Sequence, residues 1–238
     1  TTTTGTANAA LGTYALDANT TGDSNTAIGY GTLTNAQTAD NNTAVGRNAL
    51  LSNSGGHSNI AVGAYALDAN TSGNGNVAAG YAALGANTTA DGNTAFGHEA
   101  LTANTTGATN TAIGKETLKA NTTGSGNVAV GSAALDAGNG DHNVAVGEDA
   151  LTANTAADNV AVGRKAMESN TTGTYNTALG RAALAANTTA DNNVAIGRAA
   201  LTANTTGTVN VAVGTNALAT VTTSSSNVAV GHNALTAN

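Results

Sequence analysis

The stretch Asn-Val-Ala-Ile-Gly-Arg-Ala-Ala-Leu-Thr-Ala-Asn-Thr-Thr-Gly-Thr-Val, residues 193–209, is the unit from which the whole chain is built. Its pattern is Asn, usually Thr or Val, Ala, an aliphatic residue, Gly, two free positions, then Ala-Leu and an Asn-Thr-Thr-Gly segment. The opening Asn, which we number position 1, stands at 8, 25, 42, 59, 76, 93, 110, 127, 143, 159, 176, 193, 210 and 227. A fixed short period predicts a repeat architecture, here one array over residues 1–238 without a linker.

Each repeat predicts one coil of a β-solenoid. Position 2 is mostly β-branched and position 4 mostly aliphatic, so positions 2 to 4 predict a short strand. Gly at position 5 ends that strand, because the turn there needs a positive φ or a close approach of two backbones. We expect a second short strand or a bend at positions 8 and 9, with its Leu inward, and a turn at positions 12 to 15.

A helical coil is disfavoured, because Gly, Asn and Thr-Thr leave no stretch of ten uninterrupted helix formers. The fold class predicted is therefore all-β, a parallel β-solenoid of about fourteen coils that rise about 4.8 Å each. Two repeats, 127–142 and 143–158, have 16 residues instead of 17, and both lack a residue after the Ala-Leu segment. A deletion costs little in a surface loop, whereas in a strand it would turn every later side chain to the wrong face.

In-register stacking places like residues above like residues. Leu33 should lie over Leu50, and the opening Asn should form an amide ladder at one corner of the coil. Because no single coil can close a core, stability is a sum of neighbour contacts along the array. The structural ladders are represented by Asn127, Ala129, Gly131 and Leu135 in one repeat and by Asn193, Ala195, Gly197 and Leu201 in another.

The constant Ala at position 3 bears on assembly. If positions 2 and 4 face the interior, position 3 faces outward, and with the small residues at position 8 it forms a smooth apolar strip. A strip of such length indicates an interface, so we expect parallel association of identical chains, most simply as a trimer. The alternative is a narrow coil that takes both faces into one interior.

Positions 6 and 7 hold most of the chemical variety, and we predict that this edge is the recognition surface, because aromatic residues and Arg dominate binding hot spots. A glycan or an anionic receptor would suit its Tyr-rich N-terminal half or its basic stretch near 164–198, respectively. The alternative is a solvated edge that only keeps the solenoid soluble. The candidate residues are Tyr14, Tyr30, Arg47, Tyr65, Tyr81, His98, Lys115, Arg164, Lys165, Arg181, Arg198 and His232.

Composition narrows the possible functions. Charged residues are 9%, aromatic residues 3%, and the net charge is −7, which argues against a nucleic-acid partner. There is no Cys, and no apolar run approaches the ~20 residues that a membrane span needs. No catalytic, phosphate-binding or zinc-binding spacing occurs. We therefore expect no enzyme activity, no cofactor and no metal, and, because residue 1 is Thr, a processed chain or a piece of a longer one.

The repeat resembles a known class of surface protein. Its Asn-Val-Ala-Val-Gly segments are similar to the YadA-like head repeat of trimeric autotransporter adhesins. The longer Asn-Thr-Ala-Ile-Gly and Ala-Leu-x-Ala-Asn-Thr-Thr-Gly segments are similar to repeats of phage tail fibres and bacterial surface fibre proteins. The resemblance implies a left-handed β-roll, a trimer and an extracellular, cell-surface or virion-surface place. The segments stand at 127–131, 143–147, 227–231, 25–29, 110–114, 100–107 and 200–207.

Three functional hypotheses follow. The first is a structural module of a fibre or filament that serves attachment, with copies joined side by side or head to tail. The second is an adhesin head that binds a receptor or glycan at the edge. The third, more remote, is ice binding, which the adjacent Thr pairs disfavour because neighbouring strand residues point to opposite faces.

Overall fold

The computed structural model describes residues 4–236. The chain divides into two compact parts, residues 1–123 and 124–238, each of which is treated by itself. We call their described residues the N-terminal part (4–123) and the C-terminal part (124–236). Within both parts the regular structure is β-strand, and no helix occurs among the described residues.

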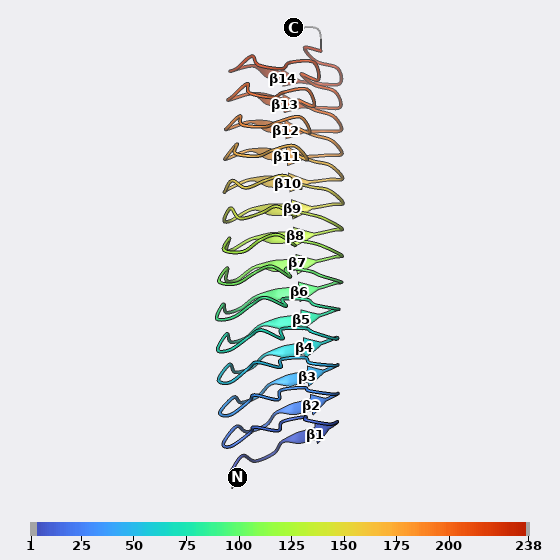
Figure 1. The fold of residues 1–238 in the computed structure, drawn as a ribbon. Coiled ribbons are helices and arrows are strands. Elements are labelled where there is room, and N and C mark those ends of the chain that lie inside the picture. Colours follow the sequence, from blue (N-terminus) through green and yellow to red (C-terminus); the bar gives the residue numbers. More distant parts are fainter. Residues whose placement is uncertain (1–3, 237–238) are drawn as a thin grey trace. The chain divides into compact units, whose positions relative to one another are not determined.

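The N-terminal part is a stack of parallel strands, one per repeat (Figure 1). Each strand pairs with the next at a spacing of one repeat, as in Thr94 opposite Thr111. The strands are β1 (Ala9–Leu11), β2 (Thr26–Ile28), β3 (Thr43–Val45), β4 (Ile60–Val62), β5 (Val77–Ala79), β6 (Thr94–Phe96) and β7 (Thr111–Ile113).

The C-terminal part repeats this arrangement (Figure 1). Its strands are β8 (Val128–Val130), β9 (Val144–Val146), β10 (Val160–Val162), β11 (Thr177–Leu179), β12 (Val194–Ile196), β13 (Val211–Val213) and β14 (Val228–Val230). The predicted all-β parallel solenoid is confirmed, while its handedness and its continuity through residues 123 and 124 stay predictions.

The two 16-residue repeats keep the strand register. Val128 lies opposite Val144, and Val144 lies opposite Val160, as in the 17-residue coils. The missing residue is therefore absorbed outside the strands, as predicted.

Positions 8 and 9 form a turn, so the expectation of a second strand there is wrong and that of a bend is right. The Leu at position 9 has a left-handed backbone, with φ 53° at Leu84 and 49° at Leu201, which no strand can contain. Two features hold this unfavourable conformation. The Leu side chain is fully buried, and its N–H donates to a carbonyl of the next coil, 3.0 Å from Leu84 N to Ala100 O.

The prediction that positions 2 and 4 of the strand face the interior and position 3 faces outward is wrong, and the structure shows the reverse. Ala at position 3 is buried in β2 to β14, as Ala78 and Ala195 illustrate, whereas positions 2 and 4 point outward. Ala at position 8, for example Ala200, is also buried rather than exposed. The reason is space: the interior already holds the Leu of position 9 and two Asn side chains per coil, so the strand can add only a methyl group.

Gly at position 5 is required by the close approach of successive coils. At Gly97, φ is +141°, and a Cβ atom would lie 2.2 Å from the carbonyl oxygen of Gly114. At Gly197, φ is +131°, and a Cβ atom would lie 2.6 Å from the carbonyl carbon of Gly214. A side chain at position 5 would therefore force two coils apart.

Two columns of buried Asn side chains run through the coils. At position 1, the N–H of Asn76 donates to Oδ1 of Asn59 over 2.9 Å, which is the predicted corner ladder. At position 12, Nδ2 of Asn87 donates to Oδ1 of Asn70 over 3.0 Å. Both kinds of Asn also bond the carbonyl of position 15, here Ala90. The sequence pattern indicated only a surface turn at position 12, and the buried column there was not foreseen.

Candidate functional site

The outer sheet face, formed by positions 2 and 4 of the strands, is the first of two candidate surfaces. All its residues within 4–236 are Thr, Ala or larger apolar residues, and none is charged. Large apolar side chains on it remain substantially exposed, with Val62 at 43% and Ile113 at 42%. The outward column at position 4 consists, in the N-terminal part, of Leu11, Ile28, Val45, Val62, Ala79, Phe96 and Ile113. In the C-terminal part it consists of Val130, Val146, Val162, Leu179, Ile196, Val213 and Val230.

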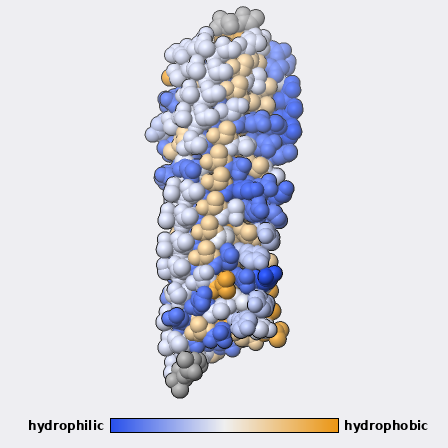
Figure 2. Space-filling view, viewed as in Figure 1, coloured by the Kyte–Doolittle hydropathy of each residue, from blue (hydrophilic) through white to orange (hydrophobic). Residues whose placement is uncertain are grey.

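Strongly apolar side chains are not spread over the whole surface. The face seen in Figure 2 is mostly hydrophilic or neutral, with a narrow column of weakly hydrophobic residues and few strongly hydrophobic ones. The exposed large apolar residues are instead concentrated in the strands, with additional Tyr side chains and a few isolated positions such as Val209. The outer sheet face is thus the distinct apolar surface of each part.

The edge at positions 6 and 7 is the second candidate surface, and the structure brings its N-terminal members together. The guanidinium of Arg47 lies 5.7 Å from the centre of the Tyr65 ring. Tyr65 and Tyr81 meet edge to face at 5.9 Å between ring centres. Tyr81 and His98 are stacked at 5.2 Å, with 21° between their planes. We call these four residues, from four successive coils, the aromatic row.

A separate pair precedes the aromatic row. Tyr14 and Tyr30 meet edge to face at 5.7 Å, and both are about half exposed. Gly31 is position 7 of the coil that carries Tyr30, and Arg47 and Asn48 occupy positions 6 and 7 of the next coil, so the Tyr side chains of the edge form two groups.

Beyond the aromatic row the edge becomes charged. Lys119 Nζ lies 2.8 Å from Glu99 Oε2 and 3.5 Å from Glu116 Oε1, and Lys115 lies 3.6 Å from Glu116. The hydrogen bond from Lys119 lowers the pKa of Glu99, and the same bond raises the pKa of Lys119. The two Lys and the two Glu side chains of this group thus balance each other's charge.

The edge of the C-terminal part carries ion pairs instead of stacked rings. Arg164 Nε donates to Glu148 Oε2 over 3.1 Å, and Lys165 Nζ lies 2.8 Å from Glu168 Oε1 and 3.9 Å from Asp149 Oδ2. Three further candidates, Arg181, Arg198 and His232, make no ion pair or ring contact among the described residues. The structure therefore does not gather the C-terminal candidates into one cluster.

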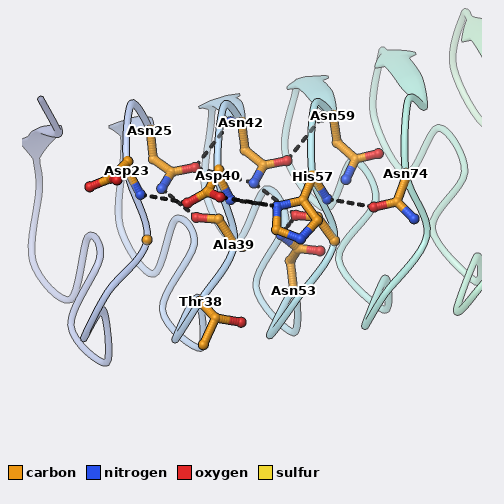
Figure 3. Close-up of polar contacts among 12 residues, drawn as sticks. Asp23, Asn25, Thr38, Ala39, Asp40, Asn42, Asn53, His57, Asn59 and Asn74 are labelled. Carbon is orange, nitrogen blue, oxygen red and sulfur yellow. Dashed lines mark hydrogen bonds and ion pairs between the residues drawn. The ribbon is translucent and has the colours of Figure 1, made fainter. Parts of the chain in front are cut away.

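A third polar column lies at position 16, and Figure 3 shows it beside the Asn column. Each backbone N–H donates to the side chain one coil further on, from Asp23 to Asp40 over 2.7 Å and from Asp40 to His57 Nδ1 over 3.0 Å. His57 N–H donates to Asn74 Oδ1 over 2.8 Å. The Nδ1 atom of His57 is also 3.6 Å from Asp40 Oδ2. The side chains of position 16 therefore act as acceptors for the backbone N–H groups of the preceding coils.

Other kinds of site find no geometric support in residues 4–236. No cavity is present there, and no three His, Asp or Glu side chains come together as a metal site would require. In the same part of the chain, no helix has the length and apolar character for crossing a bilayer.

Comparisons with known proteins do not add to this picture. The chain matches no protein-family model, no curated protein and no solved structure. The resemblance to YadA-like head repeats and to tail-fibre repeats therefore stays a prediction from the motifs.

Proposed function

We propose that this chain is a non-enzymatic structural module of an extracellular fibre or filament, in which copies associate in parallel through the outer sheet face. The observation that carries the proposal is the uninterrupted uncharged surface of positions 2 and 4 in each part. A sheet apolar on both faces is ordinarily covered on both. Rotational symmetry about an axis parallel to the coils gives every copy the same environment, and the motif resemblance favours three copies.

The size of the surface supports association. A three-residue strand about 10 Å long, in a stack that rises about 4.8 Å per coil, presents roughly 50 Å² of flat surface. Seven strands per part therefore present roughly 350 Å², within the size of the largest apolar patch on a typical monomer, a patch that is often functional. A second copy of this chain matches such a surface best, because its own outer sheet face has the same spacing and no charge.

Solution mass tests the proposal directly. Light scattering after size-exclusion chromatography should give three times the 22.8 kDa of one chain. Val62→Lys with Ile113→Lys should give monomers, since a covered Lys leaves an unpaired charge in the interface. Val209→Lys is the matched control: this apolar side chain is 54% exposed but lies outside the strands, so the trimer should persist. A wild-type chain that stays monomeric at high concentration contradicts the proposal.

A second function, recognition of a receptor or glycan at the edge, is favoured by the aromatic row. Exposed rings that hold one another in place lose little conformational freedom on binding. Binding to candidate host cells should fall with Tyr65→Ala and Tyr81→Ala, whereas Arg181→Ala tests the basic stretch separately. Unchanged binding by all three variants would reject the edge as the recognition surface.

A further inference from the structure

The coil does not require the aromatic row. Positions 6 and 7 hold small residues in many coils, for example Ala64 and Ala82 beside the row itself and Ala199 in the C-terminal part. Those coils have the same strands and turns as their neighbours. The coil therefore forms without side chains such as those of Arg47, Tyr65, Tyr81 and His98.

The row has the physical character of a binding surface. Its members contact one another in sequence across four coils, so each ring is held by the next. Arg47, Tyr81 and His98 are exposed, and Tyr65 is partly exposed. Arg47 makes no ion pair with a carboxylate among the described residues, and its guanidinium N–H groups are available as donors. Tyr81 and His98 cover one ring face of each other, and the row offers its remaining exposed ring surface together with hydrogen-bonding groups.

We propose that the aromatic row binds an extended, uncharged polysaccharide that runs along the coil axis with about one sugar ring per coil. This inference rests on the second function proposed above, recognition at the edge. The C–H faces of sugar rings pack on aromatic rings, and Arg, Tyr and His supply donors and acceptors for sugar hydroxyls. The coil rise of about 4.8 Å is close to the advance per ring of an extended β-1,4-linked chain.

Charge and shape favour a neutral, continuous chain over other ligands. Residues 1–123 contain seven acidic and three basic side chains, a net charge of −4, which repels a polyanion. The row is an open surface, because no cavity exists among residues 4–236 that could enclose a terminal sugar. A chain that continues past both ends of the row fits such a surface.

Titration calorimetry with defined oligosaccharides tests the inference. Cello-, manno- and chito-oligosaccharides of two to six rings serve as neutral probes, and hyaluronan oligosaccharides of equal length serve as the anionic comparison. The affinity for at least one neutral series should rise with each ring up to about four, the number of coils in the row, and then level off. The anionic series should bind more weakly.

The variants are chosen to separate ring contacts from other effects. Tyr65→Ala with Tyr81→Ala should weaken binding by about tenfold or more, the loss typical of hot-spot rings. Tyr65→Phe with Tyr81→Phe keeps the rings and should retain most of the affinity. Tyr175→Ala is the control, because Tyr175 is 62% exposed, makes no ring contact among the described residues and lies outside the edge. Circular dichroism checks that each variant is folded.

The experiments distinguish failure of the polysaccharide proposal from failure of recognition at the edge. If the Tyr65→Ala and Tyr81→Ala double variant loses cell binding but the wild type binds no neutral oligosaccharide, the ligand class is wrong and recognition at the edge survives. Tighter binding of the hyaluronan series than of the neutral series would likewise show that the ligand class is wrong and that recognition at the edge survives. If neither cells nor oligosaccharides distinguish this double variant from the wild type, both proposals are overturned.

Discussion

The N-terminal and C-terminal parts share one coil but differ at its edge. In both, position 3 Ala, position 9 Leu or Met and position 1 Asn form columns along the interior. At positions 6 and 7, the N-terminal part stacks Arg47, Tyr65, Tyr81 and His98. Both parts also form ion pairs between neighbouring coils, as between Lys119 and Glu99 and between Arg164 and Glu148. The contacting rings occur only in the N-terminal part of the described chain.

The difference shows which positions the solenoid constrains. An interior residue packs against the same residue type in the next coil. A substitution that changes its size or polarity therefore no longer matches the unchanged neighbour. An edge residue has water on one side, and an exposed ion pair is worth only about 0–1 kcal/mol. An aromatic pair contributes about 0.5–1.5 kcal/mol, so the rings and ion pairs of the edge each add little beside the interior columns. The predictions below test whether the interior is as uniform as the edges are different.

The largest effect is expected at position 5. Gly97→Ala and Gly197→Ala should each lower the free energy of unfolding by on the order of 3 kcal/mol or more, because the new methyl group meets the backbone of the next coil. Urea unfolding, with hydrogen exchange to locate the loss, measures both. Gly75→Ala is the control: φ is +64°, nothing lies within 4 Å of the added Cβ, and only the left-handed backbone costs about 1–2 kcal/mol. Equal losses in all three variants would contradict the close-approach argument.

The Leu column should give the next largest effect, and the same effect in both parts. Leu84→Ala and Leu201→Ala each empty a fully buried site and should cost about 2–5 kcal/mol. The two losses should agree closely, since the neighbours are alike. A much smaller loss in one part, measured by urea unfolding, would show that its interior is packed less tightly.

Two substitutions in the Asn column at position 12 should change stability in opposite directions. In the C-terminal part Val221 interrupts the column, and Oδ1 of Asn204 is buried without a hydrogen-bond partner. Val221→Asn should restore the bond and stabilise by about 1 kcal/mol, while Asn104→Val in the N-terminal part should create the same defect beneath Asn87 and cost about 1–3 kcal/mol. Thermal unfolding of both variants checks the signs; destabilisation by Val221→Asn would show that the apolar contact of Val221 outweighs the missing bond.

The repeat length and the β-branched residues at positions 2 to 4 were enough to predict the coil and its strand, because both are local signals. They also predicted that the two 16-residue repeats lose their residue outside the strand. The facing of the strand was predicted wrongly, because bulky Val and Ile ordinarily lie inside and Ala is tolerated outside. What reverses this rule is the interior volume left by Leu84 and by Asn76 and Asn87, which depends on the whole coil. The sequence predicted an edge at positions 6 and 7, but it did not predict which of its rings touch.

The smallest predicted effects concern pH, and two carboxylates of the N-terminal part should respond with opposite signs. The bond from Lys119 lowers the pKa of Glu99, so its contribution is present above the pKa of the unfolded chain and is lost as pH falls through the lower, folded pKa. Partial burial raises the pKa of Asp68, so its contribution is present below the unfolded pKa and is lost as pH rises through the folded pKa.

Melting temperatures between about pH 3 and pH 7 distinguish these two responses. Glu99→Gln should lower the melting temperature at neutral pH and have little effect in acid, because the charge that Lys119 binds is then already lost. Asp68→Asn should raise the melting temperature at neutral pH, since it removes a charge that burial disfavours, and should do little in acid. If both variants shifted the melting temperature in the same direction at neutral pH, the opposite environments assigned to Glu99 and Asp68 would be wrong.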